Sequence, residues 1–156
     1  MKTAVVFYSL DGNCASVAEE IKSQLNADLL RLQTKDDKKR GSIARFFWAG
    51  GMMFSKKLPP LKPYAFNPQD YDLIVIGAPV WAGSPAAPVK TFITDAAISG
   101  KKIAVFVCHA GGRGDSLEKL KSLLTGNDII AEADFFNAAK NSEEMKKKAA
   151  EWLKGV

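Results

Sequence analysis

The sequence predicts an α/β fold in which five parallel strands form a doubly wound sheet with helices on both faces. Three observations indicate this class. Short apolar runs recur along the 156 residues, and segments with helical periodicity alternate with them. The runs in the middle of the chain are apolar almost throughout, which is typical of parallel strands that are buried on both faces. The length suits one domain with one core.

The start of the chain predicts a strand, a turn and a helix. Residues Lys2 to Tyr8 have the sequence KTAVVFY, which predicts a buried strand. The polar segment Asp11-Gly12-Asn13 follows and predicts a turn. An amphipathic helix is expected next, because apolar side chains recur there at helical spacing at Val17, Ala18, Ile21 and Leu25.

The remaining elements repeat the alternation of strand and helix. Further strands are expected at Asp28 to Leu32, Asp72 to Gly77, Lys102 to Cys108 and Ile129 to Phe136. Further helices are expected at Val89 to Ala97, at Ser116 to Leu124 and from Ser142 onward. Such sheets have right-handed crossovers and bind ligands beyond the carboxyl ends of their strands, so the loops that follow the strands are expected to carry the function.

One connection, at about residues 36–68, is much longer than the others. It begins basic, continues with an aromatic and methionine-rich stretch at 43–54, and ends rich in proline. Loops of this length tend to be functional or to contain their own helix. We therefore expect a helix with a bend at Gly50-Gly51. This segment could pack on the sheet, line a substrate site or form a dimer contact, and the sequence leaves these three roles open.

Composition and charge exclude several classes of function. No apolar run is long enough to cross a membrane, and no export signal follows Met1, so we expect a cytoplasmic protein. The net charge is +5, but the lysine clusters are separate and mixed with acids, which argues against nucleic acid and membrane surfaces as partners. Cys14, Cys108 and the single His109 lack the spacing of a metal site, so no metal is expected. The oligomeric state is left open.

The first of three distinctive loops runs from Ser9 to Cys14, between the first strand and its helix. Backbone N–H groups and the helix dipole favour an anion there. Gly12 permits close approach of the backbone, while Ser9 and Asn13 offer side-chain donors. The loop lacks the glycine fingerprints of nucleoside triphosphate and dinucleotide sites. It suits a phosphate, although a plain turn with a helix cap explains the pattern about as well.

The second and third loops suit a flat ring. The second, at 77–85, places an aromatic side chain in a proline-stiffened turn among small residues, with Pro79, Val80, Trp81, Ala82 and Gly83 at its centre. A tryptophan there is expected to stack on a flat ligand. The third is dense in glycine, which lets backbone wrap a ligand closely, and contains His109, Ala110, Gly111, Gly112 and Arg113. A cationic His109 or Arg113 would stabilise an anionic reduced ring, although an ordinary loop histidine is equally plausible at 109.

In their order and amino-acid sequence the three loops resemble those of the flavodoxin family. The resemblance is carried by the segments YSLDGNCASVAEEI, DLIVIGAPVWAGSPAAPVKTFI and KKIAVFVCHAGGRGDSLEKL. The resemblance covers essentially the whole chain and implies strand order 2-1-3-4-5, with FMN as the cofactor. It implies that the FMN phosphate is bound by Ser9, Asp11, Gly12, Asn13 and Cys14. It also implies that the ring lies between Trp81 with its neighbours and the segment from His109 to Arg113.

Two departures from the family pattern leave the function open between three hypotheses. Asp11 and Cys14 stand where the family has threonines, and the net charge is +5 where electron-carrying flavodoxins are acidic. The first hypothesis is an FMN electron carrier that serves a redox partner protein. The second is a small FMN-dependent NAD(P)H:quinone-type oxidoreductase that acts on a flat acceptor. The third is a binding module that has lost its flavin. No catalytic residue is assigned.

Overall fold

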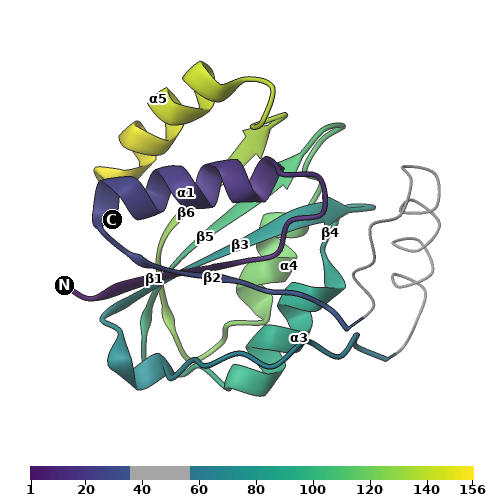
Figure 1. Cartoon of the computed structure of the whole chain (residues 1–156), viewed down its shortest axis with the longest axis vertical. Coiled ribbons are helices and arrows are strands. Elements are labelled where there is room, and N and C mark those ends of the chain that lie inside the picture. Colours follow the sequence, from purple (N-terminus) through teal and green to yellow (C-terminus); the bar gives the residue numbers. More distant parts are fainter. Residues whose placement is uncertain (36–56) are drawn as a thin grey trace.

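Five parallel strands form the centre of the molecule, in the order β2-β1-β3-β5-β6 (Figure 1). The computed structural model describes residues 1–35 and 57–156. The strands are β1 (Thr3–Phe7), β2 (Asp28–Arg31), β3 (Leu73–Trp81), β5 (Lys102–His109) and β6 (Asp128–Phe136), and a short β4 (Ser84–Pro85) pairs antiparallel with β3. Counted among the five parallel strands, the order is the predicted 2-1-3-4-5, which confirms the predicted fold class.

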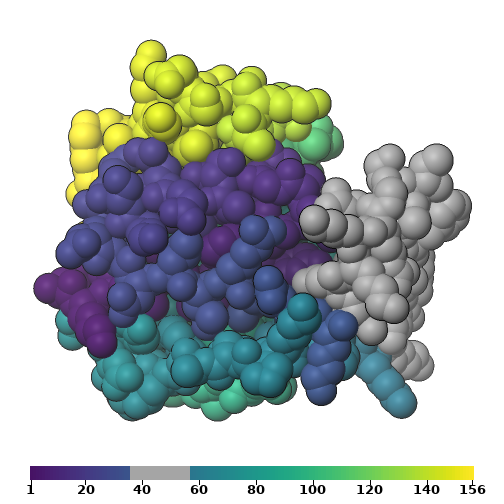
Figure 2. All heavy atoms as spheres, in the orientation of Figure 1, coloured from purple at the N-terminus to yellow at the C-terminus, as the bar shows by residue number. Residues whose placement is uncertain are grey.

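Helices cover both faces of the sheet. The helices α1 (Asn13–Leu25) and α5 (Ser142–Leu153) lie side by side on one face, which Figures 1 and 2 show in purple and yellow. The helices α3 (Ala87–Ala96) and α4 (Ser116–Ser122) cover the other face, and a single 3-10 turn, η1 (Pro68–Asp70), precedes β3. None of the helices in the two described ranges is long and apolar enough to span a bilayer.

The alternation of side chains along the central strands builds a core on each face. In β1, Val5 and Phe7 pack with α1 and α5, whereas Val6 packs with α3 and α4. All five residues of β1 are buried, because β2 and β3 flank the strand and helices cover both of its faces. This explains why the strand is apolar throughout instead of alternating with polar residues.

The prediction that the third strand ends at Gly77 is wrong, and so is the prediction of a loop at 77–85. The strand β3 continues to Trp81, and its parallel pairing with β5 extends to Pro79 opposite Cys108. The chain then turns back at Ala82 and Gly83, which have positive φ angles of 46° and 71°. The longer strand forms because β5 continues to His109 and offers hydrogen-bonding partners beyond Gly77.

The described end of the long connection lies along α3. Thr34 forms an isolated bridge with Leu61, and the Thr91 hydroxyl of α3 donates to the Pro59 carbonyl at 2.8 Å. The rings of Tyr64 and Phe66 pack on Phe92 of the same helix. Leu61, Tyr64 and Phe66 thus pack against the core on this face, whereas the bend expected at Gly50-Gly51 lies outside the described residues.

Candidate functional site

The three loops singled out in the sequence gather at one edge of the sheet, because parallel strands end at the same edge (Figure 1). Direct contacts join the hairpin β3–β4 to the third loop and to α4. The Lys119 ammonium of α4 donates to the Gly83 carbonyl at 3.2 Å. A Cβ added at Gly114 would lie 3.3 Å from the Gly83 Cα, so a side chain at 114 would fit only if the hairpin β3–β4 shifted slightly.

The first loop is held in shape by its own side chains. The buried Ser9 hydroxyl accepts hydrogen bonds from the backbone N–H groups of Gly12 (3.1 Å) and Ala15 (3.2 Å). The exposed Asp11 carboxylate accepts from the Asn13 N–H at 3.1 Å, at the first residue of α1. The Asn13 carbonyl oxygen accepts from the Ala139 N–H at 2.9 Å. The acceptor atoms of these side chains therefore order the loop.

Cys14 lies beneath this loop in the core on the α1 face, next to Cys108 of β5. Burial raises the pKa of the Cys14 thiol well above its usual range, and a hydrogen bond with Cys108 adds to the effect. The thiol therefore stays neutral and adds no negative charge beside the first loop. Its position in the core explains why a small apolar residue can stand where the family has a threonine.

The second group of predicted site residues forms the tip of the hairpin β3–β4. Trp81 is half-buried, and its ring meets the buried Tyr8 ring edge to face, with centroids 5.8 Å apart. Tyr8 follows β1 and Trp81 ends β3, so this contact joins two neighbouring strand ends. Pro79 is buried, Val80 and Gly83 are half-buried, and Ala82 is exposed at the turn.

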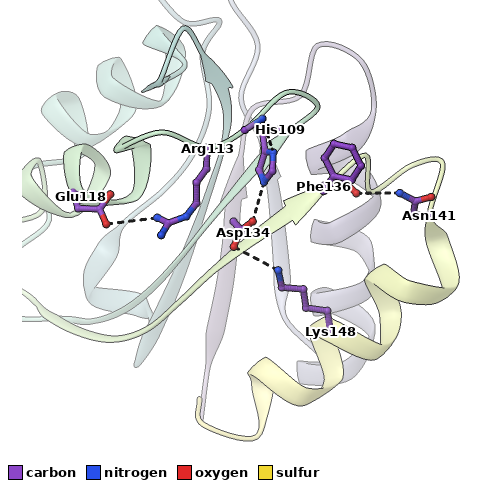
Figure 3. Close-up of polar contacts among 8 residues, drawn as sticks. His109, Arg113, Glu118, Asp134, Phe136, Asn141 and Lys148 are labelled. Carbon is purple, nitrogen blue, oxygen red and sulfur yellow. Dashed lines mark hydrogen bonds and ion pairs between the residues drawn. The ribbon is translucent and has the colours of Figure 1, made fainter.

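The third loop begins with His109, which is fixed from both sides of its ring (Figure 3). The Nε2 atom lies 2.8 Å from Asp134 Oδ2 on β6, and Nδ1 accepts from the Gly112 N–H at 3.2 Å. Since Nδ1 is an acceptor, the ring proton is on Nε2 and is donated to Asp134. His109 therefore orders the exposed segment Ala110, Gly111 and Gly112.

Arg113 lies late in the third loop and points toward α4 (Figure 3). Its Nη1 atom lies 3.6 Å from Glu118 Oε1, too far for a hydrogen bond. Within the described residues, Arg113 Nη1 and the Ser116 hydroxyl are buried without a hydrogen-bonding partner. Buried polar atoms without partners are rare, and they often belong to sites that bind a ligand or a water molecule.

These features fit the FMN that the sequence resemblance implies. A Cβ added at Gly12, Gly111 or Gly112 would meet no atom of residues 1–35 or 57–156 within 4 Å, so the described part of the chain leaves the backbone of the first and third loops uncovered there. Gly12 and Gly112 have positive φ angles of 95° and 115°, which side chains rarely adopt. Both loops therefore have bare backbone at the edge where the Trp81 ring also lies, an arrangement that a cofactor could approach closely.

Sequence reasoning missed three polar residues that support these loops. Arg31 ends β2 and donates from Nη2 to the Ser9 carbonyl at 3.0 Å. Asp134 of β6 accepts from His109, and Lys148 of α5 lies 3.5 Å from the same carboxylate. They come from strands and helices far along the chain, so no local motif marks them. The run from Ile129 to Phe136 is apolar apart from two acidic residues, Glu132 and Asp134, and nothing in it distinguishes Asp134 from Glu132.

Replacing Asp134 with Asn is expected to lower the free energy of unfolding by roughly 1–2 kcal/mol near neutral pH, since a hydrogen bond to a charged group is lost. Burial acts to raise the pKa of Asp134, but the His109 hydrogen bond and the Lys148 charge outweigh it and lower the pKa below its usual value. The stabilisation is therefore present above the carboxyl's unfolded-state pKa and is lost as pH falls through the folded-state pKa. Urea unfolding over a series of pH values measures it.

Glu132→Gln is the matched control for this experiment. Glu132 is on the same strand and forms a more exposed ion pair with Lys121 at 2.5 Å, so its replacement should change stability little. The stability difference between Asp134→Asn and the native protein should shrink toward acidic pH. A difference that stays constant with pH would contradict the role assigned to the Asp134 charge.

Comparison with known proteins shows one family and one fold. A family model described as flavodoxin matches residues 2–154. A flavoprotein from Lactobacillus acidophilus NCFM, crystallised in complex with FMN, is 24% identical with a TM-score of 0.74, covering 91% of this chain and 97% of that one. No curated protein matches the sequence.

Two further structures have the same architecture. The apo form of the flavoprotein from Lactobacillus acidophilus NCFM, determined by NMR, is 25% identical with a TM-score of 0.67, covering 90% of this chain and 95% of that one. Oxidised flavodoxin 1 from Bacillus cereus is 19% identical with a TM-score of 0.58, covering 100% of this chain and 99% of that one. The matches extend over nearly the full length of each protein, so the likeness concerns the whole domain.

Proposed function

Because this chain belongs to the flavodoxin family, we propose that it transfers electrons through a bound FMN. The observation that carries the proposal is the meeting of three ordered loops, with bare glycine backbone and a half-buried tryptophan, at one edge of the sheet. Doubly wound sheets bind their ligands at this edge, where the strand order reverses. In this sheet the order reverses between β1 and β3, which carry the first loop and the hairpin.

Each loop has a separate part in holding the cofactor. The first loop, from Ser9 to Cys14, receives the phosphate at the N-terminus of α1, where the backbone N–H groups and the helix dipole favour an anion. Trp81 stacks on the flavin ring, and its neighbours Pro79 to Gly83 shape the pocket edge. The loop from His109 to Arg113 covers the ring from the other side. When bound, FMN supplies a ring that accepts and donates electrons.

The partner in this proposal is a redox protein. With a net charge of +5, the chain attracts an acidic partner and associates with it faster at low salt. We place the reaction in the cytoplasm, where the two buried cysteines Cys14 and Cys108 stay reduced.

A second candidate function is a small FMN-dependent NAD(P)H oxidoreductase that reduces a flat acceptor such as a quinone. The net charge of +5 favours this function, because electron-carrying flavodoxins are typically acidic and this chain is basic. In this reading the carboxyl edge of the sheet admits the acceptor next to the flavin ring, and the protein positions both molecules.

An absorbance spectrum distinguishes these functions. The purified protein is recorded before and after addition of FMN, and then of NADPH without oxygen. We expect flavin bands that shift on binding and that bleach only when an external reductase is added, as for a carrier. Bleaching by NADPH alone would favour the oxidoreductase. Absence of any flavin binding would refute both and leave a binding module that has lost its cofactor.

A further inference from the structure

We propose that Arg31 binds the FMN phosphate and gives the protein its preference for FMN over riboflavin, an inference that rests on the proposed function. Arg31 ends β2, where it pairs with Phe7, two residues before the first loop begins. Its Nη2 atom donates to the Ser9 carbonyl at 3.0 Å. The guanidinium is thereby attached to the first residue of the loop that receives the phosphate.

The pleat of the sheet places Arg31 on the same face as the start of α1. Paired residues of neighbouring parallel strands point to the same face, and Phe7, the partner of Arg31, packs in the core under α1. Leu29, two residues before Arg31, packs in that core as well. Arg31 therefore lies on the side of the sheet where the N–H groups of α1 begin.

Binding a phosphate at the first loop requires a nearby cation, because the polar side chains of the loop are already bonded to other parts of the protein. The Ser9 hydroxyl and the Asn13 side-chain oxygen accept backbone N–H groups, and the Cys14 side chain is in the core. Asp11 adds a negative charge at the same helix end. A phosphate dianion placed there would be repelled by this carboxylate, and a nearby positive charge offsets that repulsion.

An arginine is suited to this position. Its guanidinium stays charged at every physiological pH and has five N–H donors, of which the bond to Ser9 uses one. The bond to the Ser9 carbonyl also restricts the side chain in advance, so that less conformational entropy is lost when an anion binds. Arg31 thus supplies charge and donors in place of the hydroxyl groups missing from the loop.

The test compares FMN with riboflavin, which has the same ring and no phosphate. Dissociation constants are measured by flavin fluorescence for the native protein, for Arg31→Gln, and for Lys22→Gln as the control. Lys22 is in the last turn of α1 and half exposed, so its replacement makes the same charge change away from the loop. We expect Arg31→Gln to weaken FMN about tenfold with riboflavin unchanged, and Lys22→Gln to change neither.

Three results would overturn the assignment, and they differ from failure of the proposed function. Equal losses for FMN and riboflavin would show that Arg31 only maintains the fold of the loop. No loss of FMN affinity, or an equal loss in Lys22→Gln, would show that Arg31 does not act on the phosphate. Failure of the native protein to bind either flavin would refute the proposed function and this inference with it. Arg31→Lys, which keeps the charge, should recover part of the FMN affinity.

Discussion

Replacing Gly77 with Ala is expected to lower the free energy of unfolding by about 3 kcal/mol, because it forces an extra methyl group into a filled core. A Cβ at this position would lie 2.0 Å from the Phe106 ring on the neighbouring strand β5. That ring is fully buried, and Phe135 and Trp152 pack on it with centroids 6.1 Å and 6.3 Å away. It therefore cannot move aside without disturbing both neighbours. Urea unfolding followed by circular dichroism measures the loss.

Two further variants test this explanation. Gly111→Ala makes the same chemical change where an added Cβ meets no described atom within 4 Å, so stability should change by less than about 0.5 kcal/mol. Phe106→Leu makes room for the new methyl group, so Gly77→Ala combined with Phe106→Leu should cost less than the sum of the single changes. Equal stability of Gly77→Ala and the native protein would contradict the steric account.

Replacing Trp81 with Ala is expected to weaken FMN and riboflavin alike, by about tenfold or more. The stacking of an aromatic side chain on a flat ring contributes on the order of 1 kcal/mol beyond its buried area, and the area itself is lost too. The phosphate plays no part in this contact, so the ratio of the two affinities should stay constant. Fluorescence titration with both flavins measures this, and Trp81→Phe should fall between the native protein and Trp81→Ala.

The control for Trp81 is an aromatic residue at the opposite end of the sheet. Tyr71 precedes β3, and its hydroxyl donates to Asp28 at the start of β2. Tyr71→Leu should leave both flavin affinities unchanged, even if stability falls slightly. Unchanged flavin affinity in Trp81→Ala would remove Trp81 from the proposed site. A selective loss of FMN there would instead connect Trp81 to the phosphate.

Most of the fold could be predicted from local patterns. The strands β1, β5 and β6 and the helices α1 and α5 follow directly from apolar runs and helical periodicity. The length of β3 could not be predicted, because small residues and a proline follow Gly77 and resemble a turn. Only pairing with β5, a contact between distant parts of the chain, makes these residues a strand.

The site could be predicted only as a set of loops. Glycines and strand ends indicate where a ligand is expected to bind, and these signals are local in the sequence. The direction of each side chain depends on partners elsewhere: Asn13 turns to Ala139, and His109 turns to Asp134. No sequence motif identifies the supporting residues Arg31 and Asp134, for the same reason. Each contacts its loop only because the folded sheet places the strands side by side.

The close approach of Gly83 and Gly114 restricts how this protein can vary. With 3.3 Å between an added Cβ at 114 and the Gly83 Cα, a larger residue at position 114 would push the hairpin outward. The Lys119 ammonium also donates a hydrogen bond to the Gly83 carbonyl, and such a displacement would break this bond. Changes in the hairpin and in the third loop are therefore expected to occur together among relatives, as compensating pairs, and a graft of one segment without the other would misfit.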